Sequence, residues 1–311
     1  MAVPGPRHLV VVGPTASGKS ALAHHLATSR PGIEIVSADS MQVYRGMDVG
    51  TAKPALSERA EVRHHLLDLV EPSERFTVAR FAAAAAPVLA DIEARGATAV
   101  VVGGTGLYVQ ALLGDLSPPG EWPEVRAEVA AWPPGQAYAR LCELDPVAAG
   151  RIEPGNRRRV ERALEVTLGG GRPFSSYGAG VGAYPATPRF QQVGVWLPRD
   201  VVARRIADRV GAMVAAGLVG EVRALAPAMG PTARQALGYK EVLAHVEAGA
   251  PLEACLEETV RRTRGFSRRQ RSWFRRDPRI RWHGTAVDPL ALLPGLAVEL
   301  DRCTEWPNRG G

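Results

Sequence analysis

Several absences in the sequence exclude whole classes of protein. The 311 residues include no stretch of about 18 apolar residues, which excludes a membrane-spanning helix. The three cysteines, Cys142, Cys255 and Cys303, are too few and too far apart for a disulfide framework or a CxxC metal pair. No charged segment precedes an apolar stretch of signal-peptide length near residue 1, so we expect a cytoplasmic protein with no membrane partner.

A phosphate-binding loop is indicated directly after the first apolar run. The segment Gly13-Pro14-Thr15-Ala16-Ser17-Gly18-Lys19-Ser20 has the spacing Gly-x-x-x-x-Gly-Lys-Ser between a predicted strand and a predicted helix. Such a loop turns backbone N–H groups and a helix N-terminus toward phosphates, while its lysine neutralises charge and its serine offers a hydroxyl to Mg²⁺. The sequence therefore predicts phosphate binding, and most loops of this kind hold ATP or GTP.

The positive charge of the chain is concentrated in one segment. Residues 261–281 contain ten arginines, no lysine and one acidic residue, Asp277, which gives the segment a charge of +9. Subtracting this from the net charge of +6 leaves −3 for the rest of the chain. Phe266, Trp273 and Phe274 lie among the arginines, and aromatic rings and guanidinium groups stack on unpaired bases. We expect this segment to contact nucleic acid rather than to form only a solvated helix face.

The first third of the chain alternates β-branched runs with helical patterns, which predicts a parallel sheet covered by helices. The predicted strands are 9–12, 33–36, 99–102 and 192–197, and the predicted helices outside the interruption are 20–29, 77–95, 201–216, 218–225, 240–248 and 252–275. Between the third and fourth strands, helical pieces at 123–132, 137–144 and 157–168 are followed by a turn-rich stretch, 169–188, that we expect to be a flexible connection. We therefore expect an α/β core of the P-loop NTPase type, formed by residues 1–113 and 190–311 and interrupted by a small all-helical insertion domain, residues 114–189.

Three segments should meet where the parallel strands end, because ligands of open parallel sheets bind beyond the carboxyl ends of the strands. One is the phosphate loop, one begins at Ser37 and contains Asp39, and one is the glycine-rich turn Gly103-Gly104-Thr105-Gly106. Asp39 is a candidate general base or magnesium ligand, although a turn or helix cap would also explain it. The strand before Gly103 ends without a carboxylate, so a second metal-binding acid is not evident.

These residues leave several functions open. A nucleotide or small-molecule kinase that uses ATP would share the phosphate loop and the sheet. A transferase acting on nucleic acid, or a module that only binds RNA, would share the basic segment. The concentration of arginine favours a nucleic-acid substrate but does not identify the reaction.

The combination of motifs resembles the tRNA dimethylallyltransferases, also called tRNA isopentenyltransferases, along nearly the whole chain. The similar stretches are GPTASGKS at 13–20, SADSMQVYRGMDVGTAKP at 37–54, HHLLDLVEP at 64–72, GGTGLY at 103–108, RRRVERALEV at 157–166, RRIADRV at 204–210, QALGYKE at 235–241 and RRQRSWFRR at 268–276. The phosphate loop is shared by many families, but the order of these motifs is specific.

The resemblance implies transfer of a dimethylallyl group from dimethylallyl diphosphate to the exocyclic amine of adenosine 37 of tRNA. The products would be N(6)-dimethylallyladenosine and diphosphate, and the partner would be the anticodon stem-loop, clamped by the insertion domain. The relatives that prenylate free adenylate remain an alternative within the same chemistry. We also expect Mg²⁺ as the cofactor and a monomeric enzyme.

The resemblance also implies roles for individual residues. Asp39 would be the general base, with Thr105 bonding near it and Arg209 reaching the diphosphate from the far side. The residues expected to hold the diphosphate are Gly13, Thr15, Ala16, Ser17, Gly18, Lys19 and Ser20, and Ser20 would be the protein ligand of magnesium. The positions similar to tRNA-contacting residues are Asp39, Ser40, Met41, Gln42, Thr105, Arg126, Arg159, Arg162, Gln235, Gly238, Tyr239, Arg269, Gln270, Trp273 and Arg275, of which Arg269 stands where the family has lysine.

Overall fold

The computed structural model describes residues 7–114, 116, 118–178 and 180–304 and contains a six-stranded parallel sheet. The strands are β1 (His8–Val12), β2 (Ile33–Ser37), β3 (His64–His65), β4 (Thr98–Gly103), β5 (Phe190–Trp196) and β6 (Arg281–Gly284). Their order across the sheet is β3-β2-β4-β1-β5-β6, and every neighbouring pair is parallel. The predicted α/β fold with a parallel sheet is therefore confirmed.

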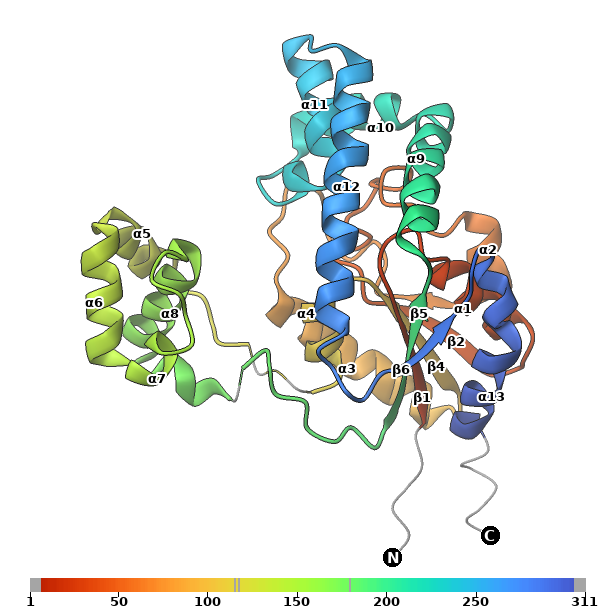
Figure 1. Cartoon of the computed structure of the whole chain (residues 1–311), viewed down its shortest axis with the longest axis horizontal. Helices are drawn as coiled ribbons and strands as arrows, with labels where there is room; N and C mark the ends of the chain where they lie inside the picture. Colours follow the sequence, from red (N-terminus) through yellow and green to blue (C-terminus); the bar gives the residue numbers. More distant parts are fainter. Residues whose placement is uncertain (1–6, 115, 117, 179, 305–311) are drawn as a thin grey trace, which may run out of the picture. The chain divides into compact units, whose positions relative to one another are not determined.

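Helices cover both faces of this sheet (Figure 1). The helices outside the insertion are α1 (Lys19–Thr28), α2 (Leu56–Glu61), α3 (Val78–Ala94), α4 (Gly106–Leu112), α9 (Arg199–Ala215), α10 (Leu218–Leu225), α11 (Tyr239–Ala248), α12 (Leu252–Phe274) and α13 (Leu293–Thr304), with short 3-10 turns at Ala226–Ala228, Ala233–Gln235 and Pro289–Leu292. The helices α9, α10, α11 and α12 pack against one another as a group. Among the described residues no single helix is long and apolar enough to cross a membrane, although the bent pair Arg199–Ala215 and Leu218–Ala228 together meets those criteria of length and composition.

The central strands are apolar on both faces because helices lie on both sides of them. All residues of β1, β2 and β4 are buried. Side chains alternate between the two faces of a strand, so Leu9 and Val11 point to one face and Val10 to the other. Leu9 and Val11 pack with Leu22 of α1 and Leu296 of α13, while α3 and α4 lie beside β4 on the opposite face. Continuous runs of valine and isoleucine are typical of such doubly covered strands.

The chain divides into two compact units, Met1–Leu112 with Ala186–Gly311 and Leu113–Pro185. The second unit falls where we expected the insertion domain, at residues 114–189. It contains α5 (Pro123–Ala131), α6 (Pro134–Leu144), α7 (Pro146–Ala149), α8 (Arg157–Gly170) and a 3-10 turn, Phe174–Tyr177. Its own core includes Val129, Leu141 and Leu164, each completely buried. The second unit thus has the packing of a separate small domain.

Several elements differ from the sequence-based expectation. The edge strands β3 and β6 were not predicted, because each is short and polar and is defined by its pairing with a neighbour. The helix α13 was also missed. In the insertion, α8 extends to Gly170, two residues into the stretch expected to be a flexible connection. Trp122 packs against this last turn so closely that a Cβ atom at Gly169 would approach Trp122 Cγ to 2.2 Å, so the contact requires glycine there.

Replacing the buried Leu22 of α1 with alanine tests the packing that anchors the phosphate loop. Leu22→Ala should lower the free energy of unfolding by about 2 to 5 kcal/mol, because the substitution leaves a cavity between α1 and the sheet. The control is Leu56→Ala in α2, where the leucine is 81% exposed and the change should stay within about 0.5 kcal/mol. Urea unfolding of both variants measures the difference, and equal effects would contradict the described core.

Candidate active site

Three loops leave the sheet side by side, at the carboxyl ends of β1, β2 and β4. Val12 at the end of β1 pairs with Gly103 at the end of β4, and Ser37 at the end of β2 pairs with Val102. The phosphate loop, the segment after Ser37 and the glycine-rich turn after Gly103 therefore start beside one another. This is the edge at which open parallel sheets bind ligands, as the sequence indicated.

The phosphate loop presents a lysine whose charge is poorly compensated. Lys19 is half-buried, and its ammonium donates a long hydrogen bond of 3.4 Å to the carbonyl of Pro14. Burial and, to a smaller extent, the nearby charge of Arg209 together lower the pKa of Lys19 to about 8, while the charge of Asp39 opposes the shift. Arg205 supports the loop from α9 by donating from Nε to the carbonyl of Ala16 at 2.9 Å. An anion in this loop would restore the ordinary pKa of the lysine.

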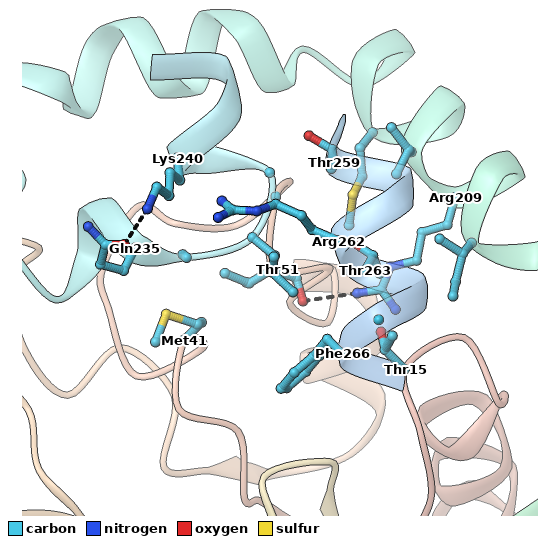
Figure 2. Close-up of a pocket in the computed structure, with 18 of the residues that line it drawn as sticks. Thr15, Met41, Thr51, Arg209, Gln235, Lys240, Thr259, Arg262, Thr263 and Phe266 are labelled. Carbon is cyan, nitrogen blue, oxygen red and sulfur yellow. Dashed lines mark hydrogen bonds between the residues drawn. The ribbon is translucent and has the colours of Figure 1, made fainter. Parts of the chain in front are cut away.

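Arg209 lies opposite the phosphate loop, on α9 (Figure 2). Its guanidinium donates from Nη2 to the carbonyl of Thr51 at 3.4 Å and is directed toward Thr15 and Phe266. Burial lowers the pKa of Arg209, and the charge of Asp39 acts in the opposite direction. Two cationic side chains therefore share one nearby carboxylate, an arrangement that favours a bound anion.

Asp39 is held by a local turn. Its Oδ1 accepts hydrogen bonds from the backbone N–H groups of Met41 at 2.8 Å and Gln42 at 3.3 Å. These bonds fix the carboxylate, and within the described residues no hydrogen bond is recorded to Oδ2. The hydroxyl of Thr105 exchanges two long bonds of 3.4 Å with Ser40, one from the Ser40 N–H and one to its hydroxyl. Asp39 and Thr105 thus face the same space, with one carboxylate oxygen free to accept a proton.

Three cavities meet at Arg209. The largest, of about 690 Å³, lies between the sheet edge and the group of α9, α11 and α12. Its lining includes the predicted residues Thr15, Asp39, Ser40, Met41, Thr105, Arg209, Gln235, Gly238 and Arg269. A second cavity of about 150 Å³ adds Lys19, Ser20, Gln42 and Gln270, and a third of about 390 Å³ adds Ala16, Gly18 and Arg205. The site therefore consists of neighbouring cavities that share Arg209, with the phosphate loop lining two of them most closely and α12 lining the largest.

Only part of the basic segment is available for a ligand. Arg268 and Arg269 are exposed on α12 at the largest cavity. Several other arginines are already paired: Arg261 with Glu258, Arg262 with Glu241 and Arg279 with Asp277, each at 2.6 Å. Arg271 is buried, donates to the carbonyl of Leu197 and stacks over Trp196 at 3.7 Å. The segment is thus both a structural helix and a charged surface.

Two side chains predicted to contact tRNA, those of Tyr239 and Gln270, are buried in the structure. Tyr239 is completely buried, its hydroxyl donates to Glu221, and its ring lies against Gly50. The pKa of Tyr239 is raised by this burial. Gln270 is only 7% exposed, and both ends of its amide bond to backbone groups of the site. Both side chains therefore have structural partners inside the protein, and Gln270 also lines the second cavity.

The remaining predicted tRNA-binding side chains are unequally available. Arg159, on α8, is exposed. Arg162 and Arg126, in contrast, pair with the buried Glu165 at 2.9 and 3.7 Å, and Arg162 also donates to two carbonyls. In the first unit, the side chain of Gln42 accepts a hydrogen bond from Ser37 and donates to the carbonyls of Thr51 and Ala52. The side chain of Gln235 accepts a hydrogen bond from Lys240 at 2.9 Å. The ring of Trp273 lies against Gly106. Arg275 is exposed and lies 6.0 Å from the ring of Trp196.

Three residues of the site were not predicted. The carbonyl of Thr51 accepts from both Gln42 and Arg209, and Phe266 lines two of the cavities. Arg205 braces the phosphate loop. Phe266 belongs to the basic segment 261–281, and Thr51 belongs to the stretch 37–54 that is similar to the family. Neither the charge of the first nor the motif of the second shows that these residues face the phosphate loop.

Comparison with known proteins identifies the family. The family model described as IPP transferase matches residues 42–277, and the model described as isopentenyl transferase matches residues 6–74. A tRNA dimethylallyltransferase of Kineococcus radiotolerans is 49% identical over 302 residues, covering 91% of this chain and 93% of the relative. That of Streptomyces coelicolor is 45% identical over 306 residues, covering 96% and 97%.

Solved structures give the same result. The tRNA isopentenylpyrophosphate transferase from Bacillus halodurans superposes with a TM-score of 0.69 at 34% identity, covering 97% of this chain and 98% of that one. A eukaryotic dimethylallyltransferase acting on tRNA has a TM-score of 0.79 at 26% identity, covering 95% and 78%. The resemblance in the motifs, the fold and the coverage agree, and the chain belongs to the tRNA dimethylallyltransferase family.

Proposed function

We propose that this enzyme takes its dimethylallyl group from dimethylallyl diphosphate and transfers it to the exocyclic amine of adenosine 37 in the anticodon loop of tRNA. The observation that carries the proposal is that Lys19, Arg209 and Asp39 line one cavity together and that Arg209 and Asp39 also line the largest one. The phosphate loop supplies a diphosphate site at one end. A carboxylate with a free oxygen stands between that site and the basic helix α12.

The chemistry follows from this arrangement. The amine nitrogen of adenine forms a bond to the allylic carbon of the donor, and the bond from that carbon to the diphosphate oxygen breaks. The bonding electrons leave with diphosphate, where Lys19, Arg209 and the loop N–H groups stabilise the developing charge. The nitrogen loses a proton to Oδ2 of Asp39, because an adenine amine is a weak base and must be deprotonated as it reacts.

Magnesium fits the residues present. Ser20 is exposed at the first turn of α1, beside Lys19 on the second cavity. Within the described part of the chain, no cluster of three His, Cys, Asp or Glu side chains could hold a metal alone. Ser20 and the diphosphate oxygens would therefore hold Mg²⁺ together with water, as is usual for this ion. When bound, the ion would neutralise charge on the leaving diphosphate.

The acceptor enters from the opposite end. The largest cavity opens beside Arg268 and Arg269, whose charges suit the phosphates of an RNA loop. An adenine turned out of the loop stack would reach Asp39 through this cavity. Arg159 and the rest of the insertion would grip the anticodon stem-loop. As the sequence led us to expect, we propose a cytoplasmic enzyme that acts as a monomer.

The alternatives are less favoured. An ATP-dependent kinase would not need the basic face of α12, and the relatives with the highest identities described above are tRNA dimethylallyltransferases. An enzyme for free adenylate would also have little use for that face. Incubation with labelled dimethylallyl diphosphate, Mg²⁺ and unmodified tRNA, with ATP and adenylate as separate controls, distinguishes them. Label in tRNA supports the proposal, whereas label in adenylate alone, or ATP turnover without transfer, contradicts it.

Changing Asp39 to asparagine tests the general base. Asp39→Asn keeps the oxygen that accepts from the Met41 and Gln42 N–H groups, so the turn should persist, but the amide cannot take up a proton. We expect kcat to fall about 10²- to 10⁴-fold while the Kd for tRNA stays within about threefold. Asp200→Asn, on the exposed surface of α9, is the control and should leave both values unchanged. A loss of tRNA affinity as large as the loss of kcat would contradict this role.

The pKa of Lys19 predicts how donor binding depends on pH. The lysine is charged below its pKa of about 8 and loses that charge as the pH rises. The affinity for a non-reacting thiolodiphosphate analogue of the donor should therefore be constant near pH 7 and fall above pH 8, approaching about tenfold per pH unit. Lys19→Met should bind weakly at every pH, without this dependence. The same decline in both proteins, measured by calorimetry, would assign the effect to another group.

Removing charge from α12 tests its contact with RNA. Arg269→Gln and Arg275→Gln should each weaken tRNA binding and reduce the slope of log K against log salt by roughly 0.7 to 0.9. Arg302→Gln is the control, because Arg302 lies on α13 and pairs with Glu299 at 2.9 Å. Binding is measured between about 50 and 200 mM salt. Slopes equal to that of the unchanged enzyme would mean that these arginines only face solvent.

A further inference from the structure

Gln270 joins two loops of the site through a single amide group. Its Oε1 accepts from the Thr15 N–H at 2.8 Å, and its Nε2 donates to the Gly104 carbonyl at 2.8 Å. Thr15 belongs to the phosphate loop, and Gly104 immediately precedes Thr105. The side chain is 7% exposed, and its amide is satisfied at both ends by these two bonds. Buried amides bonded in this way hold their partners at a fixed separation.

The glycine-rich turn is shaped to receive this side chain. A Cβ atom at Gly104 would come within 2.5 Å of Gln270 Nε2, and a Cβ atom at Gly106 would come within 2.1 Å of Trp273 Nε1. Gln270 and Trp273 are three residues apart and so share one face of α12. The close approach of these two side chains requires glycine on both sides of Thr105, so the turn that carries Thr105 packs directly against the helix.

The same helix also reaches the acceptor side of the site. Phe266, one turn before Gln270, lines two of the cavities, and the exposed Arg268 and Arg269 border the largest one. The inner face of α12 therefore contacts the phosphate loop and the Thr105 turn, while its outer face carries the charge that we assign to RNA binding.

We propose that Gln270 is a positioning residue that sets the distance between the phosphate loop and Thr105, and so aligns the allylic carbon of the donor with the adenine amine. This role rests on the function proposed above, because Gln270 joins the phosphate loop, which would bind the donor, to the Thr105 turn, which would face the acceptor. Gln270 itself touches neither reacting atom. Its effect is on alignment, where a displacement of about 1 Å costs on the order of 10²-fold in rate.

Gln270→Met tests this role, because methionine has a similar volume but makes neither hydrogen bond. We expect kcat to fall about 10- to 100-fold and the KM for the donor to rise about three- to tenfold, while the Kd for tRNA stays within about twofold. Gln192→Met is the matched control. Gln192 is 2% exposed in β5, donates to Thr187 at 3.4 Å and lines none of the three cavities described. Both variants should melt at similar temperatures, with only the first losing activity.

Several results would overturn the proposal. An unchanged kcat and donor KM in Gln270→Met would show that the two bonds do not align the reactants. A rise in the Kd for tRNA with no change in kcat would show that Gln270 contacts tRNA instead. A loss of activity in the control Gln192→Met as large as that in Gln270→Met would show that the role of Gln270 is purely structural.

A second variant covers the case in which Gln270→Met does not fold. Gln270→Glu keeps the side-chain volume and the acceptor for Thr15 but cannot donate to Gly104 when ionised, so kcat should fall at least about tenfold. Full kcat in this variant would contradict the proposal. The unchanged enzyme is assayed alongside: its failure to prenylate tRNA would refute the proposed function, whereas normal transfer together with a fully active Gln270→Met would refute only the role of Gln270.

Discussion

The parallel pairing of β4 with both β1 and β2 determines where the chemistry takes place. Because the three strands end in register, the loops that follow them begin side by side at the carboxyl ends of the strands. The phosphate loop, Asp39 and the Thr105 turn therefore lie close together. The pairing in turn requires strands that are apolar on both faces, since helices cover the sheet from both sides. The helices α9 and α12 then complete the site by adding Arg209 and Gln270 above these strand ends.

Electrostatics make the site selective for an anion before any substrate is present. The pKa of Lys19 falls from 10.5 to about 8, which corresponds to about 3 kcal/mol of unfavourable free energy in its charged form. Arg209 is disfavoured by burial in the same direction. A bound diphosphate would reverse both effects, so part of the binding free energy of the proposed donor would come from compensating the two positive charges of Lys19 and Arg209. The negative charge of Asp39 opposes the lowering of the pKa values of Lys19 and Arg209 but does not cancel it.

The sequence was sufficient for the central strands, the phosphate loop and the family, but not for the roles of α12. Valine and isoleucine runs identify buried strands directly, whereas β3 and β6 are short edge strands that only pairing defines. A motif gives the identity of a residue without its direction. Gln270 and Trp273 lie on the inner face of α12 and Arg269 is exposed on its outer face, a difference in direction that the motif containing all three does not show. The burial of Tyr239 was not predicted for the same reason, since it depends on contacts with Glu221 and Gly50, which are not neighbours of Tyr239 in the sequence.

The position of the insertion also has a consequence during synthesis of the chain. On one side β1 pairs with β4, which ends at residue 103, but its partner on the other side, β5, begins only at residue 190. At roughly 5 to 20 residues per second, a ribosome needs about 4 to 17 seconds to make the 86 residues between them. Throughout that interval the apolar strand β1 has an open edge, which is the kind of surface that pairs with other chains. The half-made protein is therefore the form most exposed to aggregation, and the one on which chaperones would act.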